Sequence, residues 1–115
     1  MATRCLPWLL DKMNRGEYLA WLAIAPNQSV AAGAGLWLMD WIPHMIGSGP
    51  RGNILNVYTA AEFRCRGLAR DLTQTAIDWC RCNHVDVVVL HASPEGRRLY
   101  ESMGFAATNE MRMKV

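Results

Sequence analysis

The feature that most constrains the fold of this chain is a strand, a loop, a helix and a second strand in direct succession between residues 54 and 90. The apolar run ILNVYT at 54–59 predicts a strand, and residues 67–83 carry apolar side chains at helical spacing. The run VDVVVL at 85–90 is apolar at nearly every position, as expected for a strand covered on both faces. Two strands joined by a crossover helix lie parallel in one sheet, so the pattern predicts an α/β fold.

The other segments predict antiparallel strands and two more helices around this unit. They are an amphipathic helix at 6–16 closed by Gly16, a hairpin of Glu17–Ala25 and Val30–Trp41, a Gly- and Pro-rich connection at Ile42–Asn53, a helix at Pro94–Met103 closed by Gly104, and a tail at 105–115 that forms one strand or a tight hairpin. The small residues AAGAG at 31–35 leave room for a bulky group nearby. The sheet is therefore expected to be mixed and mostly antiparallel, with one parallel pair.

Length and charge limit the protein to one domain and few classes of partner. A chain of 115 residues supports a single domain, expected to span residues 1–115. The net charge of +2 is too small to predict nucleic-acid binding. The longest apolar window, Tyr18–Pro26, is too short to span a bilayer, and no secretory signal is evident. A cytoplasmic protein that binds neither membranes nor nucleic acid is expected.

The cysteines do not predict a metal site or a disulfide framework. Cys80 and Cys82 form a C-x-C pair on a predicted helix, a spacing that matches neither a zinc finger nor a secreted scaffold. Free thiols are expected, with Cys80 and Cys82 inert. Cys65 lies among the arginines of a loop, so it is expected to be the more oxidisable residue.

The loop between the first strand and the helix has the properties of a phosphate site. The residues EFRCRGLA place two arginines and a glycine where a strand enters a helix. Free backbone N–H groups and the positive end of the helix dipole meet there. The loop is expected at the carboxyl edge of the sheet, where open α/β sheets bind ligands. The loop residues proposed to hold phosphate are Arg64, Cys65, Arg66, Gly67, Leu68 and Ala69.

Two motifs in this order resemble the GNAT superfamily of acyl-CoA-dependent N-acyltransferases. The first is Arg64-x-x-Gly67-x-Ala69 after a strand, and the second is Leu99-Tyr100-Glu101-x-x-Gly104-Phe105 after the next strand and helix. The resemblance covers the chain from about residue 6 to its end. It implies a GNAT-like domain that is shortened at its N-terminus, without the family's usual first strand and first helix.

The resemblance implies an N-acetyltransferase that passes an acetyl group from acetyl-CoA to a primary amine by direct attack, without a metal. The pyrophosphate of coenzyme A would bind the backbone amides of residues 65–69, with charge from Arg64 and Arg66. In such proteins the two parallel strands separate at a bulge, so unpaired backbone groups of Val57 and Thr59 would bind the pantetheine arm. Ser93 stands where many relatives carry an asparagine that contacts this arm.

The resemblance also implies catalytic roles. The amide of Val57 would hold the oxyanion that forms on the thioester, and Tyr100 would protonate the departing thiolate. Some relatives carry a carboxylate near the start of the central strand as the general base. This sequence has Asn53 and Asn56 there, and neither accepts a proton at neutral pH.

The general base must therefore lie elsewhere, or water must relay the proton. Histidine is a common general base, and His91 follows the predicted strand 85–90 directly. Glu62 and Glu110 are the nearest carboxylates by sequence. Packing roles for Tyr100 and His91, and a solvated loop for Arg64 and Arg66, are the alternatives.

Two further functions and one assembly remain open. The first function is a degenerate domain that binds acyl-CoA for regulation without turnover. The second is an unrelated module that uses the loop Arg64–Ala69, called the arginine loop below, to bind a nucleotide. Without a first strand, Glu17–Ala25 becomes a sheet edge that contains neither Lys nor Pro, and a homodimer that covers this edge is expected.

Overall fold

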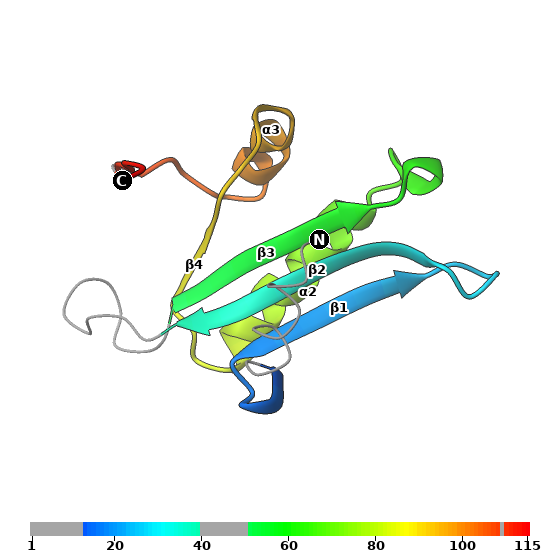
Figure 1. The fold of residues 1–115 in the computed structure, drawn as a ribbon, viewed down its shortest axis with the longest axis horizontal. Coiled ribbons are helices and arrows are strands. Elements are labelled where there is room, and N and C mark those ends of the chain that lie inside the picture. Colours follow the sequence, from blue (N-terminus) through cyan, green and yellow to red (C-terminus); the bar gives the residue numbers. More distant parts are fainter. Residues whose placement is uncertain (1–12, 40–50, 109) are drawn as a thin grey trace.

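The computed structural model describes residues 13–39, 51–108 and 110–115. Within them, four strands form one sheet in the order β1, β2, β3, β4 (Figure 1). The strands are β1 (Tyr18–Ile24), β2 (Val30–Met39), β3 (Arg51–Thr59) and β4 (Val87–Leu90). β2 pairs antiparallel with both β1 and β3, whereas β3 and β4 are parallel. The prediction of a mixed, mostly antiparallel sheet with one parallel pair is confirmed.

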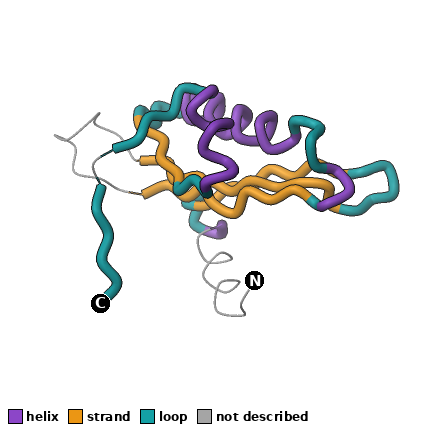
Figure 2. The backbone as a smooth tube through the Cα atoms, turned by 90° about the horizontal axis from the view of Figure 1, so that it is seen from above, coloured by secondary structure: helices purple, strands orange, loops and turns teal. Residues whose placement is uncertain are grey.

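The helix α2 (Leu68–Cys82) joins the two parallel strands and lies along one face of the sheet (Figure 2). Its buried residues Thr73, Ala76 and Cys80 are spaced three and four apart, so they share one side of the helix. A short 3-10 helix, η1 (Ala61–Phe63), precedes α2, and the helix α3 (Pro94–Ser102) follows β4. The sequence predicted α2 and α3 within one residue at each end, but it did not predict η1.

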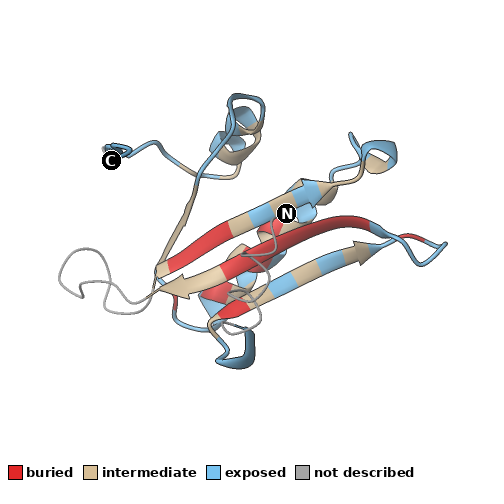
Figure 3. Cartoon of the chain, viewed as in Figure 1, coloured by how far each residue is buried: buried red, intermediate tan, exposed pale blue. Residues whose placement is uncertain are grey.

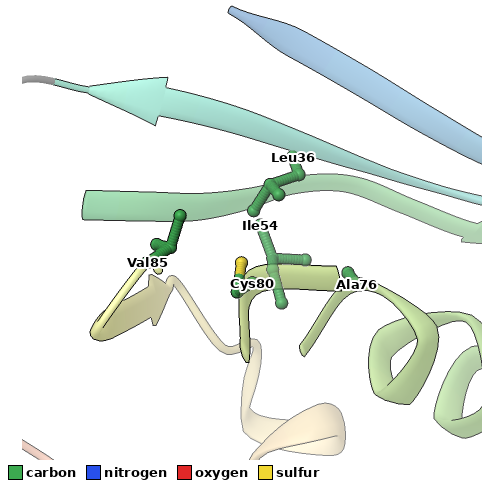
Figure 4. Packing of buried hydrophobic residues seen from close by; sticks show 5 residues of the cluster. All are labelled: Leu36, Ile54, Ala76, Cys80 and Val85. Atoms are coloured by element: carbon green, nitrogen blue, oxygen red, sulfur yellow. The ribbon is translucent and has the colours of Figure 1, made fainter. Parts of the chain in front are cut away.

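The core lies between α2 and the centre of the sheet. Leu36 and Ile54 are partners across β2 and β3, and both belong to the buried cluster (Figure 4). Ala76, Cys80 and Val85 complete this cluster. Burial raises the pKa of the Cys80 thiol to about 11, so it stays protonated at neutral pH. The buried surface is concentrated in β2 and the first half of β3 (Figure 3).

The predicted connection at Ile42–Asn53 extends too far towards the C-terminus, because β3 already begins at Arg51. Arg51, Gly52 and Asn53 pair with β2 on one side and with β4 on the other. Gly52 indicated a loop in the sequence, yet a Cβ atom there would lie 3.0 Å from Leu36 and 3.3 Å from Cys80. Any larger residue would have to displace the Leu36 or Cys80 side chain by a few tenths of an ångström, so the close packing favours a glycine inside this strand. Residues 40–50 lie outside the described residues.

Two other expectations are also corrected. The second parallel strand does not span 85–90, because β4 begins at Val87. Val85 lies just beyond the turn that follows α2, and its N–H donates to the Cys80 carbonyl at 2.9 Å. All four residues of β4 are half-buried, so in the described structure the strand is not fully covered on both faces. The described part of the tail contains no strand, and Met111, Met113 and Val115 are exposed.

The opening helix predicted at 6–16 falls mostly outside the described residues. Its end is visible: Gly16 adopts φ +71° and donates its N–H to the Met13 carbonyl at 3.1 Å. The expected hairpin is confirmed, and β1 forms the free edge of the described sheet. No helix among the described residues is long and apolar enough to cross a membrane.

Candidate active site

The two parallel strands pair over four residues only and then separate. Their register runs from Arg51 opposite Val87 to Ile54 opposite Leu90, where β4 ends. β3 continues to Thr59, while the chain after β4 turns away towards α3 (Figure 1). Beyond Ile54, the β4 side of β3 therefore has no strand partner in the described sheet.

A β-bulge lies on β3 at the point of separation. Gly33 pairs with Tyr58 and Gly35 with Leu55, so β3 advances three residues where β2 advances two. Asn56 has φ +55°, a left-handed conformation that asparagine tolerates better than most residues. Asn56 and Val57 have no partner of their own in either neighbouring strand. The bulge expected from the resemblance is present, and it frees the backbone of these two residues.

The separation opens a pocket of about 360 Å³. It is lined by Ile54, Leu55, Asn56, Val57, Leu90, His91, Ser93 and Tyr100. The structure therefore brings Val57, His91, Ser93 and Tyr100 together around one cavity, although they come from β3, the end of β4 and α3. Four of these eight residues are apolar and four carry polar side chains, so the cavity offers a small molecule both apolar contact and hydrogen-bonding groups.

The arginine loop lies beyond β3, where Thr59 ends the strand. Cys65 and Gly67 both adopt left-handed backbone conformations, with φ +64° and +77°. Gly67 is the N-cap of α2 and provides no side-chain cap, so the first amides of the helix are open to a ligand. A Cβ atom at Gly67 would meet nothing within 4 Å. The space above this glycine is therefore free for an anion to approach the main chain.

The charged side chains of this loop are exposed. Arg64, Cys65 and Arg66 lie at the surface, and the guanidinium of Arg66 lies 5.3 Å from the centre of the Phe63 ring. Leu68 and Ala69 are half-buried, because they begin α2. The loop combines unpaired amides with two accessible positive charges. These are the groups that bind the phosphates of a nucleotide or of coenzyme A.

Tyr100 is held by the end of α3. The Phe105 N–H donates to the Tyr100 carbonyl at 3.0 Å, and the Gly104 N–H donates to the Glu101 carbonyl at 3.1 Å. Gly104 has φ +104°, so these four residues form a Schellman motif. The rings of Tyr100 and Phe105 pack edge to face, with centroids 5.9 Å apart. Burial raises the pKa of Tyr100, which keeps the phenol protonated and able to donate a proton at neutral pH.

Ser93 and His91 occupy the other side of the pocket. The Ser93 hydroxyl oxygen accepts a hydrogen bond from the Gly96 N–H at 3.1 Å and caps α3. Its hydrogen is the part still available to a ligand. His91 is largely exposed, and its Nε2 lies 3.9 Å from Oε1 of Glu110. The tail thus brings Glu110 to His91, whereas Glu62 lies on η1 and does not line the pocket.

Sequence reasoning missed the role of Tyr18. The Asn56 side-chain amide donates to the Tyr18 hydroxyl at 3.0 Å. The Tyr18 ring lies over Gly35, and a Cβ atom at that position would overlap its hydroxyl group. The small residues at 31–35 were the signal for a bulky neighbour, and that neighbour is this tyrosine. The described residues contain no cluster of three or more His, Cys, Asp or Glu that could hold a metal ion.

Comparison with known proteins identifies the fold and its family. The family model of the acetyltransferase (GNAT) family matches residues 2–105, while a search of curated proteins finds no match. A GCN5-related N-acetyltransferase from Ralstonia eutropha JMP134 superposes with a TM-score of 0.89 at 32% identity, over 97% of this chain and 74% of that chain.

Two other solved structures are similar. A predicted acetyltransferase from Clostridium acetobutylicum, solved with acetyl-CoA, gives a TM-score of 0.88 at 25% identity, over 97% of this chain and 73% of that one. Glucosamine-6-phosphate N-acetyltransferase from Arabidopsis thaliana shares the fold, with a TM-score of 0.79 at 18% identity, over 97% and 74% of the two chains. The pocket and the arginine loop thus lie in a known framework, and the chain belongs to the GNAT family of acetyltransferases.

Proposed function

We propose that this protein transfers an acetyl group from acetyl-CoA to a primary amine by direct attack of the amine. The observation that carries the proposal is the bulge at Asn56 and Val57, which opens beside Tyr100 at the only place where β3 and β4 separate in the described sheet. An unpaired strand edge offers backbone hydrogen bonds to an extended ligand, and the pantetheine arm of coenzyme A is such a ligand. Thr59 lies further along the same edge, towards the arginine loop.

The residues fit the two ends of acetyl-CoA. The amides of Cys65, Arg66, Gly67, Leu68 and Ala69 would bind the pyrophosphate, and the exposed charges of the loop complement it. The Ser93 hydroxyl would donate to the arm from the opposite wall. The pocket would then receive the thioester, which supplies the activated acetyl group.

The chemistry proceeds by one bond exchange. The amine nitrogen bonds to the carbonyl carbon as the Val57 N–H donates to the carbonyl oxygen, where negative charge develops. The carbon–sulfur bond breaks, and Tyr100 gives its phenolic proton to the sulfur. His91, with Glu110 beside it, is the candidate that takes the proton lost by the amine, directly or through water.

Calorimetric titration of the purified protein with acetyl-CoA, coenzyme A and ATP tests the first step. Micromolar binding that is selective for the CoA compounds would support the proposal. ATP binding of equal strength would favour a nucleotide module, and CoA binding without turnover of any amine would favour a regulatory acyl-CoA-binding domain.

Gly67→Glu locates the binding within the same experiment. A carboxylate at Gly67 would project into the space that is open to an anion, so binding should be abolished. Arg112→Gln lowers the net charge by the same one unit in the exposed tail and serves as the control. Equal affinity in Gly67→Glu and the unmodified protein would remove the loop from the proposed site.

A homodimer that covers the free edge of β1 stays a prediction. Leu22 and Ile24 of this strand are exposed, at 59% and 54%. Sedimentation should therefore show a dimer, and a monomer at high concentration would contradict it.

A further inference from the structure

The Asn56 amide is the polar side chain of the bulge, and the Tyr18 hydroxyl on β1 holds it in place. Its Nδ2 donates to the Tyr18 hydroxyl at 3.0 Å, which fixes the plane of the amide. Tyr18 is 6% exposed and packs directly over Gly35, so its ring has little freedom to move. A rigid partner of this kind orients the residue that it binds.

This arrangement leaves one atom of Asn56 available to a ligand. With Nδ2 used by Tyr18, the Oδ1 atom has no hydrogen-bond partner among the described residues. Asn56 lines the pocket and directly precedes Val57. An amide oxygen accepts hydrogen bonds and cannot take a proton at neutral pH. The Asn56 Oδ1 atom is therefore suited to a ligand that places a hydrogen-bond donor close to the Val57 amide.

The hydrogen-bonded pair of Tyr18 and Asn56 lies on the face of the sheet that α2 does not cover. Leu19 packs against the core on the α2 side, and neighbouring residues of a strand point to opposite faces. Tyr18 therefore points away from α2, and its hydrogen bond places the Asn56 amide on the same side. The arginine loop instead leads directly into α2. The cofactor and the Tyr18–Asn56 pair thus reach the bulge from different sides.

We infer that Asn56 orients the acceptor: its Oδ1 accepts a hydrogen bond from an N–H of the incoming amine, and Tyr18 is the positioning residue that aims this oxygen. The inference deepens the proposed acetyl transfer and rests on it. The Asn56 amide does not deprotonate the amine. It selects a nitrogen that still has an N–H to donate while its lone pair faces the carbonyl carbon beside Val57.

The test separates the side chain of Asn56 from its backbone. Asn56→Gly removes the amide but keeps a residue that adopts φ +55° without strain, so the bulge is retained. With methylamine as the acceptor, the KM for the amine should rise about tenfold, as expected for the loss of one hydrogen bond, while the Kd for acetyl-CoA stays unchanged. Asn56→Asp restores an oxygen acceptor and tolerates the same backbone, so it should recover part of this loss.

Tyr18→Phe tests the positioning role with its own control. It should raise the KM for methylamine about three- to tenfold, with the Kd for acetyl-CoA again unchanged. Tyr58→Phe makes the same chemical change two residues beyond Asn56, at a side chain that is 54% exposed, and should alter neither constant.

The outcomes separate the inference from the proposed function. An unchanged KM for methylamine in Asn56→Gly would overturn the inference and leave the acetyl transfer intact. Selective acetyl-CoA binding by the unmodified protein, with no turnover of methylamine and no shift of the Asn56 side-chain resonances on adding it, would also overturn the inference. Failure of the unmodified protein to bind acetyl-CoA would instead overturn the proposed function, and the inference with it.

Discussion

The two helices that follow the parallel strands are held in very different ways. α2 buries three residues against the sheet and shares a core with β2 and β3. α3 buries none (Figure 3). It is tied to α2 by a hydrogen bond from Arg70 to Ser102 at 3.0 Å. Regions with little buried apolar surface open more easily than the core. The proposed phosphate loop is thus built on the firm part of the molecule, and the proposed acid Tyr100 on the looser part.

This contrast has a chemical use. Binding the polar end of a cofactor needs amides held in a fixed array, as the N-terminus of a packed helix provides. Protonating a leaving group needs one side chain at one point, which a short helix can supply if its end is well formed. The Schellman motif at Gly104 and the contact of Tyr100 with Phe105 give α3 that local order.

The largest effect is expected from Tyr100→Phe, which leaves the packing on Phe105 and removes the proton. Turnover should fall by about 10- to 1,000-fold, whereas acetyl-CoA affinity should change little, because only the transition state uses the proton. Steady-state kinetics beside calorimetry checks both quantities. Unaltered turnover would show that Tyr100 only packs, and the looser region would lose its proposed role in the chemistry.

The firm region should respond most to Gly35→Ala. The new methyl group would overlap the Tyr18 hydroxyl group, so the free energy of unfolding should fall by about 3 kcal/mol. Gly33→Ala is the matched control on the same strand, where the neighbour at 3.1 Å is the end of the Leu22 side chain, more than half exposed. Denaturant unfolding should show less than about 1 kcal/mol for the control. Equal losses in both variants would mean that Tyr18 is not fixed in place.

A smaller and more local effect is expected from Gly104→Ala. Placing alanine at φ +104° costs about 1 to 2 kcal/mol, and this cost should appear as opening of α3 rather than of the whole domain. Hydrogen exchange should speed up in α3 but not in α2, and turnover should drop several-fold. Gly16→Ala also changes a glycine at positive φ, yet far along the chain from α3, and should leave α3 exchange unchanged. Equal acceleration in α2 and α3 would contradict the division into firm and loose regions.

The smallest effect is expected from Arg70→Ala, which removes the hydrogen bond between the two helices. Because both side chains are exposed, the loss should be about 0.5 kcal/mol. It should be visible as faster exchange in α3. Arg97→Ala removes the ion pair with Glu101 inside α3, at 3.1 Å, and controls for the loss of one arginine contact. A larger effect from Arg97 would show that α3 depends on its own contacts more than on α2.

The fold was predictable to the extent that local patterns determine it. Helical spacing in α2 and the apolar run before it identified the parallel unit, and the motif ending in Gly104 and Phe105 has a local physical basis in the Schellman hydrogen bonds. The predicted start of β3, Ile54, lies three residues after its observed start, Arg51, because Gly52 indicated a loop. The preference for glycine at this position comes from close packing on Leu36 and Cys80, which are distant in sequence.

The proposed site was predictable only in part, for the same reason. Four residues predicted for the site, Val57, His91, Ser93 and Tyr100, do line the cavity. The hydrogen bond between Tyr18 and Asn56 joins residues 38 positions apart, and it depends on the register of three strands and on the bulge. The register is not visible in one sequence, and the bulge was expected only through the family resemblance. The pairing of Glu110 with His91 likewise depends on the path of the tail.

The one extra residue in β3 makes chain length, rather than side-chain identity, the sensitive variable in this strand. Deleting a single residue between Leu55 and Tyr58 would let the hydrogen-bond ladder with β2 run without interruption. The sheet would become more regular, but the pocket would lose the bulge that lines it. A scan that exchanges residues one at a time would pass over this dependence. Insertions and deletions would reveal it, and a redesign of this domain that idealised its strands would erase the site while improving the scaffold.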